Sequence, residues 1–395
     1  MNNGIMATSV AAPPLDEDGT PLPRPLSLMV ATLILCSGFV LVVYGLKQTD
    51  AMHLVGLFCA TAVLIMCGTA MIGHLPVLRD TLKRERTFLL AGILVCTLIY
   101  PFLANDPYQL HMLAIGGLFA LMAIGLNVNV GFAGLADFGY IAYYAIGAYA
   151  SALLNVRLGL DFWLCLPLAA VFTSALSMLV ALPAVRVRGH YLALVTLGFS
   201  FIVIQLITNL EVLTGGTQGV FGIAPPSLFG HSFQQPLKLF GTALPYQANF
   251  YYLTVALLCL AVLVCGRLSA SRWGRAWRAM RADEVAASAA GLNLMKLKLM
   301  AFGTGSSFGG IAGALYAHMI GYIDPSSFRV IESMFLLAVV AIGNWRIGGI
   351  IVSAVLFAIL PEKLRAFDEW RLLIFGVLLL IVMLARSKRM LATAH

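Results

Sequence analysis

The chain has 395 residues, of which 61% are hydrophobic and only 11% are charged, and its mean hydropathy is +0.93. One soluble core cannot bury so much apolar surface, so the composition excludes a soluble globular protein and indicates an all-α polytopic membrane protein. The net charge of +8 does not indicate nucleic-acid binding, because the basic residues separate apolar runs and do not gather on one soluble module.

The N-terminal part divides into a tail and a group of membrane helices. Residues 1–25 are rich in proline and small residues and lack an apolar core, which predicts a disordered cytoplasmic tail and no signal peptide. Residues 26–109 are expected to hold three spans, at 26–46, 52–72 and 87–103. The loop at 74–86 is placed in the cytoplasm because it carries four basic residues, Arg79, Lys83, Arg84 and Arg86.

A polar interruption follows the next span, which is predicted at 110–130. Between 125 and 154, glycines and polar residues break the apolar pattern, so two membrane helices are expected to meet at a broken or re-entrant segment. Asp137 lies in this segment, and it either lines a translocation path or caps the following helix at the N–H groups of residues 138–140. Asn127 and Asn129 either present amides to the same path or satisfy the broken backbone.

Two more spans are predicted at 162–182 and 191–210. Thr196 and Ser200 lie four residues apart on the second span and are further candidates for the translocation path. The alternative is that both hydroxyls bond to their own helix backbone. Residues 211–249 contain several glycines and only one lysine, which predicts the largest loop on the outer side of the membrane.

The longest charged interruption after the N-terminus is the stretch 272–298, which follows a span predicted at 250–266. Four arginines recur every three residues and predict one basic stripe on an amphipathic helix, with Trp277 and Met280 on another side: Arg272, Arg275, Arg278 and Arg281. The pattern continues through Ala286 and Ala287 and predicts that the helix stops at a left-handed Gly291. The stretch is either a juxtamembrane segment on anionic headgroups or a docking helix that transmits the motion of a partner.

The C-terminal part begins with a predicted span at 300–320, in which Gly305, Gly309 and Gly313 recur every four residues. Small residues at this spacing allow helices in lipid to pack closely, so this span is expected to be a packed interface. Two short apolar segments, 333–342 and 347–360, are expected to hinge at the glycines between them, and a last span is predicted at 372–384. The total is ten to twelve membrane-embedded segments, and the placement of most Lys and Arg residues predicts that both termini are cytoplasmic.

No set of residues indicates catalysis. The chain has no GxxxxGK(S/T) motif, and GTGSSFGG at 303–310 lacks the lysine and the preceding strand of a nucleotide loop. The seven cysteines form no CxxC pair and have no histidine at ligand spacing, so no metal site or disulfide is predicted. An ion-coupled secondary transporter would need more ionisable groups inside the membrane than Asp137, and a non-transporting scaffold would leave the broken helices unexplained.

Four blocks of sequence together resemble the LivM-type permease subunits of branched-chain amino acid ABC importers: GLNVNVGFAGLADFGYIAYYAIGAYASALL, RVRGHYLALVTLGFSFI with LTGGTQGVFGI, WGRAWRAMRADEVAASAAGLNLMKLKLMAF and DPSSFRVIES. The resemblance covers residues 110–386 in the family's order and leaves 387–395 as a cytoplasmic tail. It implies a multi-pass subunit of the cell inner membrane. The implied partners are a second, LivH-like permease, two cytoplasmic ATPases that bind the ATP, and a periplasmic binding protein, which the loop at 211–249 is expected to meet.

The resemblance also implies roles for residues. It identifies the stretch from Arg275 to Gly291 as the ATPase-coupling loop, with Glu284, Ala286, Ala287 and Gly291 at the positions of the family's EAA-and-Gly motif. In the span at 191–210 the family commonly has an acidic residue followed by an arginine. This chain has Phe201 and Gln205 at those positions instead. A second departure is Trp345 and Arg346 in place of small residues. These changes leave urea, short amides or other amino acids open as substrates.

Overall fold

The computed structural model describes residues 86–104, 106–184, 190–228, 230–239 and 242–363, and Thr32 and Gly376 as single residues. The chain divides into two units. The first comprises Met1–Gln109 and Lys363–Asp368, and the second comprises Leu110–Glu362 and Glu369–His395. The predicted tails at 1–25 and 387–395, the spans at 26–46, 52–72 and 372–384, and nearly all of the loop at 74–86 lie outside the described residues.

The described part of the first unit is mainly helix α4, Arg86–Ala104, which agrees with the span predicted at 87–103. Pro101 lies inside this helix near its C-terminal end. The side chain of Tyr100 donates a hydrogen bond to Gln109, with 2.7 Å between the oxygen atoms.

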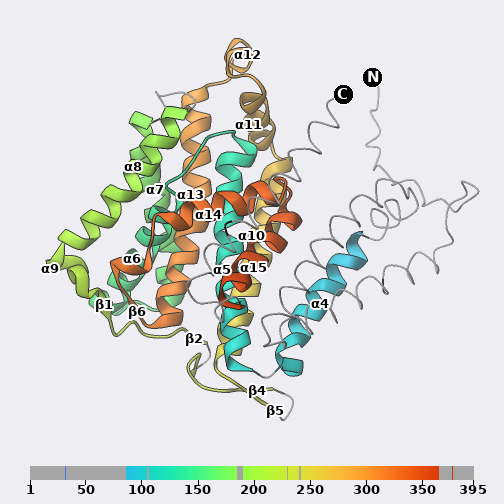
Figure 1. The fold of residues 1–395 in the computed structure, drawn as a ribbon, viewed down its shortest axis with the longest axis vertical. Helices are drawn as coiled ribbons and strands as arrows, with labels where there is room; N and C mark the ends of the chain where they lie inside the picture. The colour runs from blue at the N-terminus through green and yellow to red at the C-terminus, as the bar shows by residue number, and fades with distance from the viewer. Residues whose placement is uncertain are drawn as a thin grey trace, which may run out of the picture. The chain divides into compact units, whose positions relative to one another are not determined.

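In the second unit, α13 (Leu294–Ile320) is the most extensively packed helix (Figure 1). Its main neighbours are α6 (Tyr140–Leu158) and α7 (Phe162–Ala184), and α8 (His190–Asn209) packs in turn on α6. Helices α5 (Pro107–Asn127) and α10 (Gln247–Ala270) complete this bundle. Most of the buried residues of α13 are glycine, alanine or serine, which lets the neighbouring backbones approach closely.

Five helices of the described residues are long and apolar enough to cross a membrane: Pro107–Phe132, Phe162–Leu182, Tyr191–Asn209, Gln247–Ala270 and Pro325–Ile342. Ala91–Ala104 and Ile347–Ile359 are shorter apolar helices. The long helices α6 and α13 are not among the five. A mostly helical, polytopic protein is therefore confirmed, whereas a total of ten to twelve embedded segments stays a prediction.

Short strands modify the all-α prediction. Three antiparallel pairs form: β1 (Val220–Phe221) with β6 (Tyr322–Ile323), β2 (Ser227–Leu228) with β3 (His231–Ser232), and β4 (Leu237–Leu239) with β5 (Thr242–Leu244). Five of the six strands lie in the predicted outer loop at 211–249, together with α9 (Glu211–Thr214) and the 3-10 turn η2 (Gly216–Gln218). A long loop satisfies part of its backbone by such pairing, and the β1–β6 pair joins it to the segment after α13.

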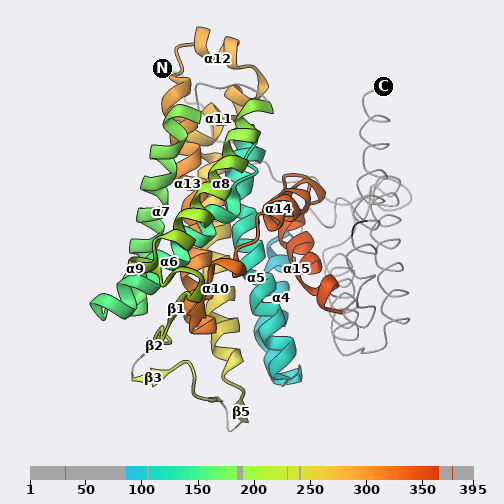
Figure 2. The ribbon, with the colours of Figure 1, turned by 60° about the vertical axis from the view of Figure 1, so that its left-hand side comes forward.

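The loop is fastened to the bundle at several points. Asn155 of α6 accepts a hydrogen bond from the backbone N–H of Ala224 at 2.8 Å. Asn249 of α10 donates to the carbonyls of Phe233 and Gln235 at 3.0 and 2.9 Å. Figure 2 shows the strand-bearing loop at one end of the bundle, and at the opposite end helices α11 (Arg272–Ala282) and α12 (Glu284–Ala289), which form the predicted coupling stretch.

The two short apolar segments are helices, as predicted. The 3-10 turn η3 (Pro325–Ser327) leads to α14 (Ile331–Ile342), and α15 covers Ile347–Lys363. The turn between α14 and α15 has φ values of 57° at both Asn344 and Trp345, which is unusual for residues with a side chain. This turn lies where the hinge is predicted.

Candidate functional site

The coupling stretch contains two helices, and the prediction of one helix that runs to Gly291 is wrong. Helix α11 covers Arg272–Ala282 and α12 covers Glu284–Ala289. Between them Asp283 is extended, and its carboxylate accepts hydrogen bonds from the N–H groups of Val285 and Ala286 at 2.8 and 3.1 Å. Aspartate is a favoured N-cap, so its side chain stabilises a new helix start at this point.

The amphipathic character of α11 is confirmed. Trp277 and Met280 are fully buried, and the indole N–H of Trp277 donates to the carbonyl of Leu297 at 2.9 Å. Ser271 caps the helix by accepting from the N–H of Gly274. The bond from Trp277 to Leu297 attaches the apolar side of α11 to the start of α13.

Helix α12 is held by an ion pair and ends as predicted. Glu284 and Lys298 of α13 lie 2.8 Å apart, and the Lys298 side chain is only 5% exposed. Ala287 is buried and Ala286 is exposed. Gly291 has a φ of 84°, and no atom lies within 4 Å of a Cβ built there, so the backbone conformation alone favours glycine.

The four arginines of the stripe point to different surroundings. Arg272 lies over the ring of Trp273, and Arg275 donates to the carbonyl of Ala270 at 2.9 Å. Arg278 is exposed. Arg281 is exposed as well, and its guanidinium donates to the carbonyl of the buried Gly131.

The predicted helix break is present between α5 and α6. A π-helix, η1 (Val128–Phe132), follows α5, and an irregular segment leads to α6. Asp137 is fully buried there: one carboxylate oxygen accepts from the side-chain amide of Asn129 at 2.8 Å, and the other accepts from the N–H of Gly139 at 3.1 Å. The bond to Gly139 is the kind that the capping alternative predicts.

The two asparagines of the break are only partly satisfied. Asn127 donates weakly to the carbonyl of Trp345, with a distance of 3.4 Å. The amide oxygens of Asn127 and Asn129 are both buried and have no hydrogen-bond partner among the described residues. A buried acceptor without a partner is unfavourable, because it has lost its hydrogen bonds to water and gained none in exchange.

Thr196 and Ser200 follow the backbone-bonding alternative. Each hydroxyl donates to the carbonyl three residues earlier, Thr196 to Ala193 at 3.0 Å and Ser200 to Leu197 at 2.6 Å. Thr196 also accepts from the N–H of Phe138 at 3.0 Å. Thr196 therefore joins α8 to the helix break, whereas Ser200 makes a contact within its own helix.

The glycines of α13 face the break and α6. A Cβ at Gly305 would lie 2.7 Å from Cγ of Asn129, and a Cβ at Gly313 would lie 2.7 Å from the backbone nitrogen of Ala148. At Gly309 the nearest atoms, on Tyr140 and Tyr143, are 3.2 Å away. The backbones of α6 and α13 therefore meet at Gly313, whereas Gly305 and Gly309 face side chains. Because residues 303–310 lie inside α13, GTGSSFGG is not a nucleotide loop.

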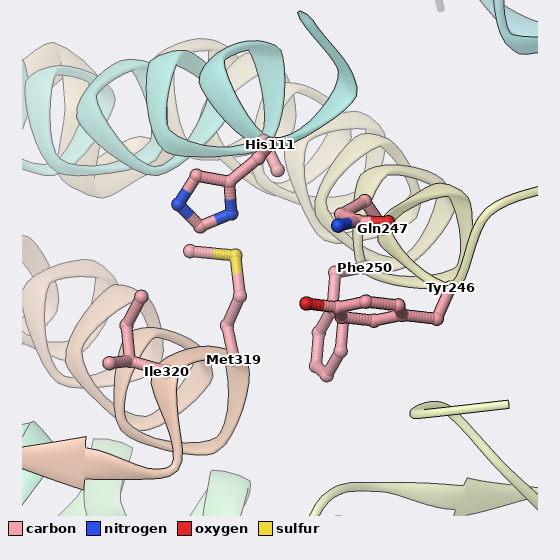
Figure 3. Close-up of a pocket in the computed structure, with 7 residues that line it drawn as sticks. His111, Tyr246, Gln247, Phe250, Met319 and Ile320 are labelled. Carbon is pink, nitrogen blue, oxygen red and sulfur yellow. The ribbon is translucent and has the colours of Figure 1, made fainter. Parts of the chain in front are cut away.

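A pocket with a volume of about 150 Å³ lies among the ends of α5, α10 and α13 (Figure 3). Its lining is His111, Ala114, Tyr246, Gln247, Phe250, Met319 and Ile320. The amide oxygen of Gln247 is buried without a hydrogen-bond partner in the described part of the chain. Because three distant segments form this pocket, the sequence offers no local signal for it. No cluster of three potential metal ligands occurs among the described residues.

Comparison with known proteins decides the family. The family model described as branched-chain amino acid transport system / permease component matches residues 108–383. The chain belongs to this family. Two relatives named high-affinity branched-chain amino acid transport system permease protein LivM, from Salmonella typhimurium and Escherichia coli, are each 37% identical over 330 residues. The alignments cover 80% of this chain and 77% of each relative.

The LivH permease protein of the same system in Escherichia coli is also similar, with 28% identity over 293 residues that cover 68% of this chain and 90% of LivH. No solved structure matches. The resemblance to LivM-type permeases is therefore confirmed, and the chain is an integral membrane protein of the permease type.

Proposed function

We propose that the chain is the membrane-spanning permease subunit of a binding-protein-dependent ABC importer that moves branched-chain or related amino acids across the inner membrane. The observation that supports this proposal most strongly is the 37% identity to two LivM permeases over 80% of the chain. ATP hydrolysis would take place in separate subunits, and no cofactor is assigned to this chain.

The proposed assembly has four further protein subunits. A LivH-like permease pairs with this chain in the bilayer, two cytoplasmic ATPases contact α11 and α12, and a periplasmic binding protein meets the loop at 211–249. The arrangement agrees with the position of this loop and of α12 at opposite ends of the bundle (Figure 1). Both termini are assigned to the cytoplasm, the side of α11 and α12, because most arginines and lysines lie in segments assigned to that side.

The translocation path is assigned to the helix break. Asn127, Asn129 and Asp137 provide the polar groups, and Thr196 connects the break to α8. In transport, partner-driven movement would separate these groups and expose the two amide oxygens to the solute. Ser200 is less suited to this role because its hydroxyl is used within α8.

The sequence departures bear on the choice of substrate. Phe201 is 56% exposed, and Gln205 is also exposed on α8, so neither contributes to the buried polar groups of the break. These departures therefore do not argue against branched-chain amino acids. Urea, short amides and other amino acids remain alternatives within the same family, and an ion-coupled mechanism is the alternative outside it.

The test is uptake by the complete complex, reconstituted with its ATPases and binding protein in proteoliposomes. Labelled leucine should accumulate only when ATP is available to the ATPases, and unlabelled isoleucine and valine should compete. Competition by urea or acetamide alone would assign a different substrate. Leucine uptake that follows an ion gradient without ATP would contradict the ABC mechanism.

A further inference from the structure

Arg281 differs from the other arginines of the stripe because its side chain reaches two other parts of the unit. One guanidinium nitrogen donates to the carbonyl of Gly131 in η1. The guanidinium carbon lies 5.2 Å from the ring centroid of Trp345, which is a favourable position for a cation–π interaction. Arg281 therefore joins α11, the helix break and the turn between α14 and α15.

Two glycines of the break make room for this junction. A Cβ at Gly134 would lie 2.7 Å from Cγ and 3.1 Å from Cβ of Arg281, and Gly134 has a φ of 72°. At Gly131 a Cβ would lie 3.3 Å from the Trp345 ring and 2.8 Å from Cγ of Asn127. Residues 131–134 (GFAG) thus form a surface against which the side chains of Arg281 and Trp345 pack closely.

The junction continues directly to the polar groups of the break. Asn127 donates to the carbonyl of Trp345, and Asn129, two residues before Gly131, donates to Asp137. The π-helix is the part of this chain of contacts best suited to rearrange, because its backbone is irregular and two buried amide oxygens lack partners among the described residues.

We propose that Arg281 is a positioning residue that transmits displacement of α11 to the helix break and to the turn between α14 and α15. The inference rests on the proposed function, because the displacement would come from the partner ATPases. A shift of α11 moves the guanidinium, which carries the Gly131 carbonyl and the Trp345 ring with it. The Asn129–Asp137 pair then changes its position when the ATPases close.

The test compares variants within the complete complex of permeases, ATPases and binding protein. Arg281→Gln removes the charge and the ring contact, and Arg267→Gln is the matched control, because Arg267 is an exposed arginine in the last turn of α10, outside the two helices assigned to the ATPases. Copurification of the ATPases measures docking. The ratio of leucine taken up to ATP hydrolysed measures coupling. Arg281→Gln should copurify normally and lose coupling by about tenfold, whereas Arg267→Gln should stay within about twofold of wild type.

Trp345 supplies a second, independent set of variants. Trp345→Leu should reduce coupling as Arg281→Gln does. Trp345→Phe keeps an aromatic face and should therefore retain most of the wild-type coupling. The double variant Arg281→Gln/Trp345→Leu should be no worse than the more impaired single variant, because both changes remove the same interaction.

Four results would overturn the proposal. Unchanged coupling in Arg281→Gln shows that the contact transmits nothing, and an equal loss in Arg267→Gln shows a general effect of lost positive charge. Failure of Arg281→Gln to copurify makes Arg281 a docking residue. Wild-type complexes that transport nothing with ATP would overturn the proposed function as well. Coupled transport by wild type together with an unaffected Arg281→Gln would overturn this inference alone.

Discussion

Replacement of Gly313 by alanine should destabilise the protein, although alanine is the better helix former. Where space is available, this change in a helix stabilises by about 0.5–1 kcal/mol. At Gly313, however, the new Cβ would lie 2.7 Å from the nitrogen of Ala148 and 3.1 Å from the carbonyl carbon of Tyr144. Both atoms belong to the backbone of α6, so the two helices must separate. Overpacking costs about 1–3 kcal/mol, which leaves a net loss of up to about 2 kcal/mol.

Two matched glycines turn this estimate into a graded test. Gly309→Ala should cost less than Gly313→Ala, because its nearest neighbours are side-chain atoms of Tyr140 and Tyr143 at 3.2 Å. Gly266→Ala on α10 should be stabilising, since no atom lies within 4 Å of the new Cβ. Thermal unfolding of the purified variants in detergent should give midpoints in this order. A Gly313→Ala midpoint at or above that of Gly266→Ala would refute close contact between α6 and α13.

Further changes test the coupling stretch and the orientation of the chain. Gly291→Val should leave insertion intact but uncouple uptake from ATP hydrolysis, because a left-handed conformation costs a β-branched residue about 1–2 kcal/mol, and Gly291→Asn should be milder. Cysteines at the exposed positions Gln218 and Gln234 should react with an impermeant maleimide from the outer side, and reaction from the cytoplasm alone would reverse the topology. Glu284→Lys should impair transport by placing a second ammonium beside buried Lys298, and the charge swap with Lys298→Glu should restore it. Binding of the stretch to lipid predicts the reverse, since an added lysine contributes about 1 kcal/mol at an anionic surface.

The positions of the helices could be predicted because membrane helices are long apolar runs that end at charged residues or glycines. Helices α4, α7 and α8 begin and end within about two residues of the prediction, which is the usual uncertainty of helix ends. The left-handed Gly291 and the break near Asp137 followed from local chemistry as well. Both features depend on residues that are adjacent in the sequence.

The division of the coupling stretch at Asp283 was missed, although a local signal was present. Aspartate directly before Glu284 and a run of alanines is a typical helix start. The recurrence of arginine and alanine on both sides of Asp283 favoured one continuous helix. In the structure a new helix starts after Asp283, because the Asp283 carboxylate accepts hydrogen bonds from two N–H groups of α12.

Contacts between distant segments could not be predicted from one sequence. The partners of Arg281 are 150 residues earlier and 64 residues later in the chain, and no periodicity connects them. The same holds for the Glu284–Lys298 pair, in which a short helix turns back onto α13. From the sequence alone, each charged residue in such a contact is indistinguishable from an ordinary surface charge.

These internal contacts narrow the surface that a partner can use. Arg281 and Glu284 contact their own chain, so the surface that α11 and α12 leave for an ATPase includes the exposed residues Arg278, Val285 and Ala286. Val285 is 70% exposed, and α12 lies at the far end of the bundle in both views (Figures 1 and 2). An exposed valine beside alanine at the tip of a short helix is suited to an apolar groove of a protein, whereas binding to anionic headgroups depends on basic residues. The tip of α12 therefore supports docking to a protein better than it supports binding to the lipid surface.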